Sequence, residues 1–157
     1  MYKWNDDISQ FNSNAWAFNY RSIFYTNVVL DGLSKLKVQS DQQALYNNIK
    51  GSALFYRSLV FFHLAQIYAP PFDLNTANLD LGIPLKLGSD INEKVQRSTL
   101  SQTYDRIIKG LKEAIPLLQV TPLYKTRPSK PAIYLLLAKV YLAMNDYTNA
   151  FCRQTPA

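Results

Sequence analysis

The feature that most constrains the fold is the apolar run ALFYRSLVFFHLAQIYA, residues 53–69, which two prolines end. The run is 17 residues long, the lower limit for a helix that crosses a bilayer. Arg57, His63 and Gln66 interrupt it, and a charge in mid-membrane is costly. Because proline cannot continue a helix and disfavours helical backbone in the residue before it, the helix must end near Ala69. The run therefore predicts the second half of a buried helix in a globular protein.

The start of this helix is predicted from SDQQ, where Ser40 and Gln43 have the spacing of a capping box. Its core face is predicted from apolar residues at mostly three- and four-residue steps: Leu45, Ile49, Ala53, Tyr56, Leu59, Phe62 and Ile67. Gly51 inside the helix costs about 1 kcal/mol relative to alanine, so we expect a packing contact there that leaves no room for a side chain. His63 is expected to be structural or half-exposed, because no second reactive group adjoins it.

An earlier helix is predicted from about Ser13 through NAWAFNYRSIFYTNVVLDGLSKL. One of its faces collects residues at three- and four-residue steps: Trp16, Tyr20, Ile23, Phe24, Asn27 and Leu30. Asn27 is the polar member of this face. We interpret it as a buried amide that bonds to neighbouring backbone.

Helical periodicity is lost between Ala69 and Leu100, where Pro, Asn, Asp and Gly are frequent. A connection of this length in a globular domain is functional or heavily packed. Within it, LGIPLKL at residues 81–87 is predicted to be a short extended segment that holds the loop against the body.

Two further helices are predicted after this loop. The first opens with a capping box of Thr99 and Gln102 and is ended by Pro116. Its apolar stripe consists of Tyr104, Ile107, Ile108, Leu111, Ala114 and Leu118. The second helix is SKPAIYLLLAKVYLAMND, with Pro131 in its first turn, where proline is tolerated.

The predicted fold class is all-α, built from tetratricopeptide-like antiparallel helix pairs with long connecting loops, because no stretch has a convincing strand pattern. The last predicted helix and the residues after it match half of a tetratricopeptide repeat at Tyr134, Leu137, Ala138, Tyr141, Tyr147 and Ala150. In this pattern the small Ala138 and Ala150 let two helices approach. A chain of 157 residues has room for one domain.

The net charge of +6 and the pI of about 9.4 raise nucleic acid or an acidic surface as partners. The basic residues are scattered, however, and the densest group, Lys125, Arg127 and Lys130, lies between prolines as in a solvated loop. We therefore expect no nucleic-acid partner. A lone Cys152 and a lone His63 exclude an intrachain disulfide and disfavour a Cys/His zinc site. With no catalytic or nucleotide-binding motif, the sequence predicts no cofactor, no metal and no enzyme.

The N-terminus MYKWNDDISQFNSNAW has no charged segment followed by an apolar run, so it is neither a signal peptide nor a transit peptide. Two interpretations remain open at this point. The chain is either a cytoplasmic protein or a piece of a longer secreted one.

Five motifs follow one another along the chain. A W…Y..IF..NVVLDGL helix is followed by G.ALFYRSLVFFHLAQIYAPPF and LGIPL, and then by R.TL.QTYDRIIKGLKEAIPLL and RPSKPAIYLLLAKVYLAMNDYTNA. In this order and spacing, the chain resembles the SusD/RagB family of Bacteroidetes from about Tyr2 to Ala150. The resemblance implies a non-catalytic, surface-exposed lipoprotein of the outer membrane. Such proteins bind oligosaccharides, or peptides in some members, and pass them to a SusC-like TonB-dependent barrel that they cover as a lid.

The resemblance also implies residue roles. Architectural positions are Ala53, Arg57, Phe61, Leu64, Tyr68, Gly82, Ile83 and Pro84. Among them, Arg57 is expected to anchor helix ends or the loop by hydrogen bonds. Ligand contacts are expected before the first helix, from Tyr2, Trp4, Asn5 and Asp6, with Trp4 foremost. The alternative for Trp4 is packing against the first helix, and the loop PPFDLNTANLD is an expected contact with the barrel.

Three departures from the family pattern affect these expectations. The signal peptide and lipid-attachment cysteine are missing, family members are several hundred residues long, and FCRQTPA at the end lacks the expected alanine-rich pattern. A truncation or frameshift would produce such an end. We therefore expect residues 1–157 to be a single domain, the partial N-terminal region of a SusD-like protein without its C-terminal half. The alternative function is a tetratricopeptide-like scaffold that binds another protein.

Overall fold

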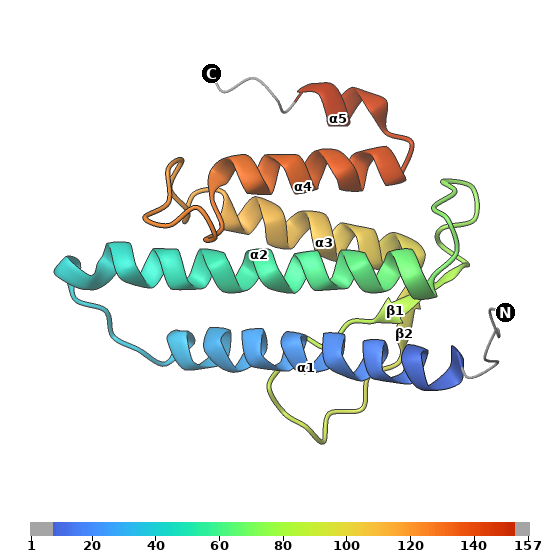
Figure 1. The fold of residues 1–157 in the computed structure, drawn as a ribbon, viewed down its shortest axis with the longest axis horizontal. Coiled ribbons are helices and arrows are strands. Elements are labelled where there is room, and N and C mark those ends of the chain that lie inside the picture. Colours follow the sequence, from blue (N-terminus) through green and yellow to red (C-terminus); the bar gives the residue numbers. More distant parts are fainter. Residues whose placement is uncertain (1–7, 153–157) are drawn as a thin grey trace, which may run out of the picture.

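The computed structural model describes residues 8–152 as a stack of helices with one small strand pair (Figure 1). The helices are α1 (Ile8–Ser34), α2 (Gln43–Tyr68), α3 (Leu100–Ala114), α4 (Lys130–Ala143) and α5 (Tyr147–Cys152), with a 3-10 turn at Ser40–Gln42. The strands β1 (Leu81–Pro84) and β2 (Arg97–Thr99) pair antiparallel. The predicted all-α class is confirmed.

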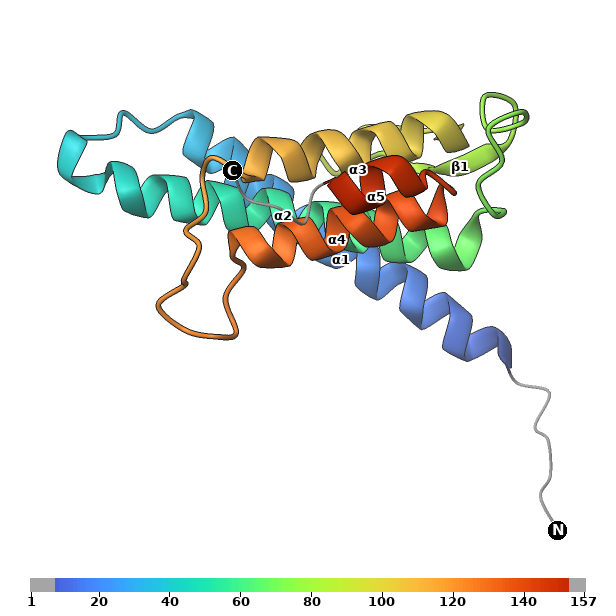
Figure 2. The same ribbon diagram turned by 90° about the horizontal axis from the view of Figure 1, so that it is seen from above.

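Successive helices run in opposite directions along the stack (Figure 1). Helix α2 packs against both α1 and α3, and α4 packs against α5. Seen from above, α1 crosses beneath α2 at an angle, so the start of α1 projects from the stack (Figure 2). The end of α2, the two strands and the start of α3 lie at the same end of the molecule as the start of α1 (Figure 1).

Helix α1 begins at Ile8, earlier than the predicted Ser13. On its predicted face Ile23 and Asn27 are buried, and the remaining members are partly buried. The face therefore points toward the core as predicted, and the buried amide of Asn27 is confirmed.

Helix α2 ends at Tyr68, directly before Ala69 and the two prolines, as predicted. The predicted capping box at its start is wrong, because no side chain caps either the 3-10 turn or α2. Gln39 is the residue with the extended backbone of a cap, so Ser40 already lies inside the turn and cannot cap it. The Gln43 side chain instead donates to Asn47 Oδ1 at 2.8 Å.

The predicted core face of α2 is only partly correct. Ala53 and Phe62 are buried, but four of its positions are exposed, namely Leu45, Ile49, Tyr56 and Ile67. The reason is that α2 lies between α1 and α3, so its buried surface is wider than one stripe and includes Leu54, Phe55, Phe61, Leu64 and Ala65. The expected close contact at Gly51 is confirmed, since a Cβ there would lie 2.9 Å from the Leu117 Cβ.

Helix α3 starts as predicted. Thr99 accepts the Gln102 amide at 3.2 Å while Gln102 Oε1 accepts the Thr99 amide at 3.1 Å, which completes the capping box. The predicted stripe is buried at all six positions, and the helix ends at Ala114, just ahead of Pro116.

Helices α4 and α5 form the predicted tetratricopeptide-like pair. Ser129 caps α4 next to Pro131, and a positive φ of 58° at Asn145 turns the chain back into α5. Of the repeat positions, Leu137, Ala138, Tyr141 and Ala150 are buried. Tyr147 departs from the pattern and is exposed, because among the described residues α5 packs on α4 alone.

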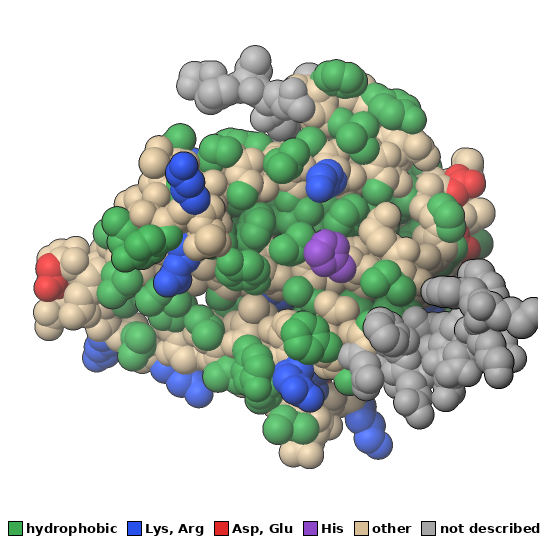
Figure 3. All heavy atoms as spheres, viewed as in Figure 1, with side chains coloured by type: hydrophobic (Ala, Val, Ile, Leu, Met, Phe, Trp, Pro, Cys, Tyr) green, Lys and Arg blue, Asp and Glu red, His purple; other side chains and the backbone are tan. Residues whose placement is uncertain are grey.

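Within the described part of the chain, no helix is long and apolar enough to cross a membrane. His63 of α2 is exposed, beyond the half-exposure expected of it. In Figure 3 this single histidine lies in the middle of a face where hydrophobic side chains surround it.

The long loop between α2 and α3 contains both strands. LGIPLKL is extended as predicted over β1, whereas the partner strand β2 was not predicted. Arg97 of β2 donates through Nε to the Gly82 carbonyl at 2.7 Å and through Nη2 to the Tyr68 carbonyl at 3.0 Å. The strand pair is thereby tied to the end of α2.

Candidate functional site

A hollow of about 220 Å³ lies between the first half of α1 and the loop that joins the two strands. Its lining residues are Trp16, Tyr20, Pro84, Lys86, Glu93 and Val95. Enclosed sites for drug-sized ligands measure about 300–1,000 Å³, so this hollow has room for a group about the size of one ring.

Aromatic rings form one wall of the hollow. Trp16 lies 4.7 Å from Tyr20 between ring centroids, with the planes tilted by 44°. Trp16 also meets Tyr68 of α2 edge to face at 4.8 Å. Rings in such tilted and edge-on contacts are held in place by their quadrupoles as well as by burial. The wall is therefore a rigid, partly buried aromatic surface.

Charged groups form the rim. Lys86 Nζ donates to the Glu93 carbonyl at 3.1 Å and to the Ile91 carbonyl at 3.5 Å, which leaves its third N–H available for another acceptor. The side chain of Glu93 is exposed and its carboxylate can accept hydrogen bonds. The rim thus offers one donor and one acceptor next to an apolar wall.

The Tyr20 hydroxyl does not contribute to this rim, because it donates to the Pro84 carbonyl at 2.8 Å. Burial raises the pKa of Tyr20, and the charge of Arg97 offsets only part of that rise. The phenol is therefore neutral at physiological pH and acts as a fixed support for the loop.

Further along α1, side chains bind the backbone of the same loop. Asn27 donates through Nδ2 to the carbonyls of Lys86 at 3.0 Å and Gly88 at 3.1 Å. Its Oδ1 accepts from Arg57 Nη1 at 3.0 Å.

The guanidinium of Arg57 is buried and has no carboxylate within hydrogen-bond distance in the described structure. The same Nη1 lies 3.5 Å from the Leu87 carbonyl. Burial lowers the pKa of Arg57 to about 10, so the group stays charged at neutral pH. A buried charge with neutral partners depends on these oxygen atoms for its solvation.

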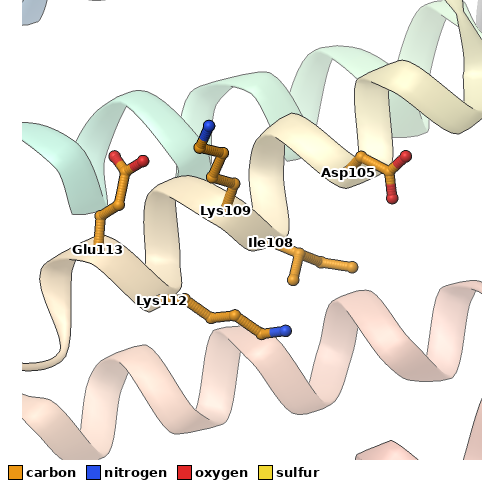
Figure 4. Close-up of a pocket in the computed structure, with 5 residues that line it drawn as sticks. All are labelled: Asp105, Ile108, Lys109, Lys112 and Glu113. Atoms are coloured by element: carbon orange, nitrogen blue, oxygen red, sulfur yellow. The ribbon is translucent and has the colours of Figure 1, made fainter.

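A larger hollow of about 530 Å³ lies along α3, lined by Asp105, Ile108, Lys109, Lys112 and Glu113 (Figure 4). All five residues come from one helix, and in Figure 4 their side chains spread apart instead of converging. None of the five is aromatic. This arrangement lacks the convergent groups of a specific small-molecule site.

Another hollow of about 220 Å³ lies at the end of α2, beside Gln66, Phe72 and Tyr104. Its two aromatic rings meet each other at 5.0 Å and are almost fully buried. Gln66 donates to the Tyr104 hydroxyl at 2.8 Å. Since neither ring presents an open face, the hollow at Trp16 is the better candidate for ligand binding.

The ligand contacts expected from the sequence, Tyr2, Trp4, Asn5 and Asp6, lie outside the described residues. The architectural set lies inside them: Ala53, Arg57, Phe61, Leu64, Gly82 and Ile83 are buried, while Tyr68 and Pro84 are partly buried beside the hollow.

Sequence reasoning missed Lys86, Glu93 and Val95, because nothing local marks them in an aperiodic loop. It placed Trp16 and Tyr20 on a helix face without recognising that this face borders a hollow. The sequence did contain one indication of an aromatic surface: Trp16 and Tyr20 are four residues apart, one helical turn.

The described residues contain no group of three or more His, Cys, Asp or Glu side chains that could hold a metal ion. The hollow itself combines an aromatic wall with a donor and an acceptor. This is the chemistry of a binding surface for a molecule with one apolar face and polar edges.

Comparison with known proteins agrees with this architecture. The SusD-like family model described as "Starch-binding associating with outer membrane" matches residues 1–142. A putative sugar binding protein from Bacteroides vulgatus ATCC 8482 is 31% identical with a TM-score of 0.81, over 90% of this chain and 31% of its own. A SusD superfamily protein from Bacteroides thetaiotaomicron VPI-5482 is 29% identical with a TM-score of 0.80, over 88% of this chain and 30% of its own.

A laminarin-binding SusD-like protein is 23% identical with a TM-score of 0.70, over 89% of this chain and 28% of its own, and supports the fold alone. A search of curated proteins finds no match. The chain spans about a third of the length of the solved structures that it resembles. Since the family model extends over most of the sequence and the same helical stack recurs in the solved structures, the chain belongs to the SusD-like family.

Proposed function

We propose that this chain is the N-terminal helical region of a glycan-binding SusD-like protein and that the hollow at Trp16 holds one sugar ring. The family membership and the sugar-binding protein among its structural relatives support a glycan as the ligand. The observation that most directly supports this site is the partly buried aromatic wall next to the charged groups of Lys86 and Glu93. The C–H face of a pyranose stacks on such a wall while its hydroxyls bond to the rim.

Further contacts are proposed from Tyr2, Trp4, Asn5 and Asp6, which precede α1 in the sequence. Because α1 begins at Ile8 and Trp16 lies eight residues on, these residues are close in sequence to the hollow. Aromatic and amide side chains of this kind suit a second ring of the same glycan.

The proposed partner is a SusC-like TonB-dependent barrel, with a lipid-anchored position on the outer surface of the outer membrane. The family description, which includes association with the outer membrane, supports this location. Loop 70–80 is the proposed contact: Asp73 Oδ1 accepts the Asn75 amide at 2.9 Å and fixes the loop, which displays Leu74 and Leu79 at 80% and 84% exposure. Replacing both leucines by aspartate should abolish co-purification with the barrel, and unchanged co-purification would exclude this contact.

Calorimetric titration of the chain with soluble starch and with laminarin tests the glycan site. We expect Trp16→Ala to weaken binding of the preferred glycan at least tenfold, which corresponds to about 1.4 kcal/mol. Tyr124→Ala is a matched control, because Tyr124 is an exposed aromatic residue in the loop between α3 and α4. That loop lies at the end of the molecule opposite the start of α1 (Figure 1). Trp4→Ala measures the contribution of the N-terminal residues in the same assay. Equal affinities of wild type and Trp16→Ala would show that the hollow at Trp16 does not bind the glycan.

A second candidate function is protein binding by the α4–α5 helix pair. Leu135 and Leu142 of α4 are exposed and lie seven residues apart, hence on the same face of the helix. The titrations separate the two functions, because a protein-binding scaffold gives no saturable response to either glycan.

A further inference from the structure

Three side chains on one face of α1 bind the backbone of loop 84–89. Tyr20, Asn27 and Asp31 are spaced by seven and four residues, so they line up along the helix. Tyr20 bonds to the first carbonyl of the loop, Asn27 to two carbonyls in its middle, and Asp31 accepts the Ser89 amide at 2.9 Å at its end. Arg57 of α2 adds a further contact, from its Nη1 to the Leu87 carbonyl at 3.5 Å.

Asn27 and Arg57 are the centre of this set. The Asn27 side chain is 0% exposed, and both ends of its amide are used, two bonds to the loop and one from Arg57. Arg57 in turn fixes the orientation of that amide, because its Nη1 donor can approach only the Oδ1 side. The pair therefore aims two N–H donors at the loop in one fixed direction.

Apart from a side-chain hydrogen bond between Ser89 and Asp31, these bonds involve the backbone of the loop, and none involves a side chain of the loop that lines the hollow. Lys86 and Glu93, which line the hollow, are bonded neither to Asn27 nor to Arg57 through their side chains. The position of the loop is thus set by α1 and α2, while the chemistry that it presents to the hollow is set by its own side chains.

We propose that Asn27 and Arg57 are positioning residues: by holding residues 84–89 they keep the whole loop 84–96 as a preformed wall of the hollow, on which Glu93 determines which glycan is selected. The proposal rests on the proposed glycan-binding function. A loop that is already ordered loses less conformational entropy when a ligand binds, so holding it raises affinity without a direct contact. A substitution of Glu93 leaves the hydrogen bonds from Asn27 and Arg57 to the loop backbone intact. The choice of glycan can therefore change while the loop stays ordered.

Asn27→Asp is the sharpest perturbation, because it keeps the shape and the acceptor for Arg57 but replaces the two donors to the loop by an acceptor. Arg57→Met is the second variant, since methionine keeps an apolar stem of similar length in a buried position. Asn19→Asp is the matched control: Asn19 also donates to a main-chain carbonyl, at 2.8 Å, but to Ala15 of its own helix.

Hydrogen–deuterium exchange of the full chain is the first measurement. We expect amides in loop 84–96 to exchange at least tenfold faster in both Asn27→Asp and Arg57→Met, with peptides of the α2–α3 core unchanged and Asn19→Asp like wild type. In a Trp4→Phe background, where Trp16 is the one tryptophan, its emission should shift in the same two variants. Unchanged exchange in the loop, or an equal rise over the whole chain, would overturn the positioning role.

Titration with soluble starch and laminarin is the second measurement. We expect Asn27→Asp to weaken binding of both glycans, whereas Glu93→Gln should change the ratio of the two affinities at least threefold while loop exchange stays at the wild-type rate. An unchanged ratio in Glu93→Gln overturns the selectivity role. A wild-type chain that binds neither glycan overturns the proposed function and the selectivity role together, and the exchange data then decide the positioning role alone.

Discussion

Replacement of Gly82 by alanine tests how closely β1 packs against the start of α3. An added Cβ would overlap the Thr103 hydroxyl and lie 2.7 Å from the Thr99 carbonyl oxygen. Overpacking of this kind costs about 1–3 kcal/mol. The Thr103 hydroxyl also accepts the Ile83 amide at 3.3 Å and donates to the Thr99 carbonyl at 2.9 Å, and each lost bond adds about 0.5–1.5 kcal/mol. With both bonds lost, we expect Gly82→Ala to lower the free energy of unfolding by about 2–6 kcal/mol, a fall in Tm of roughly 4–24 °C.

Urea denaturation followed by circular dichroism measures this change. Gly32→Ala is the matched control, because an added Cβ in α1 meets nothing within 4 Å and alanine favours a helix by up to about 1 kcal/mol. A double-mutant cycle with Thr103→Ala isolates the contact: once the hydroxyl is gone, Gly82→Ala should cost less. A strictly additive cycle, or a Gly82→Ala protein as stable as wild type, would refute the close approach of β1 to α3.

Three further predictions concern the capping box of α3 and the contacts of Tyr20 and Asp31 with loop 84–96. Thr99→Ala removes a complete capping box and should cost about 1 kcal/mol in urea denaturation, while an unchanged midpoint would show that the cap contributes nothing. Because burial raises the pKa of Tyr20 above its unfolded value of about 10, stability is complete below pH 10 and falls above it by up to about 1.4 kcal/mol per pH unit. Tyr20→Phe should flatten this alkaline decline, and an equally steep decline would contradict the role of Tyr20. Bonds from Ser89 lower the pKa of Asp31, so its contribution is present above the unfolded pKa of about 3.9 and is lost as the pH falls. Between pH 6 and pH 3, the protection of amides in loop 84–96, measured relative to their intrinsic exchange rate at each pH, should therefore fall more in wild type than in Asp31→Asn, and parallel profiles would count against this.

Helix ends that depend on neighbouring residues were mostly predictable. Of the two capping boxes predicted from the same spacing, one forms and the other does not. Thr99 with Gln102 forms the expected box, whereas Ser40 with Gln43, at the same spacing, forms none. The difference lies in the backbone: Thr99 is extended, but the extended residue at the other site is Gln39. Residue types at a given spacing favour a cap but do not determine which residue adopts the extended conformation.

The candidate site was predictable only on its helical side. Trp16 lies on a face that periodicity identifies, because the helix repeat is local. Lys86 and Glu93 reach the same hollow from a loop about 70 residues further along the chain, and their position depends on bonds to the backbone that no local pattern encodes. The exposed positions on α2 have a similar cause, since a helix between two neighbours has no single buried stripe.

The buried polar residues show how far the sequence can indicate such long-range contacts. In the described part of the chain the buried polar or charged side chains are Asn27, Arg57, Ser58 and Thr103. Three of them bond to the segment that runs from β1 to the start of α3: Asn27 and Arg57 to its middle, and Thr103 near its ends through the Ile83 amide and the Thr99 carbonyl. A loop that lies against helices buries amides and carbonyls, which must find partners, and here helix side chains supply them. A polar residue in an otherwise apolar helix face therefore indicates that irregular backbone crosses that face, and Asn27 is such a residue in α1.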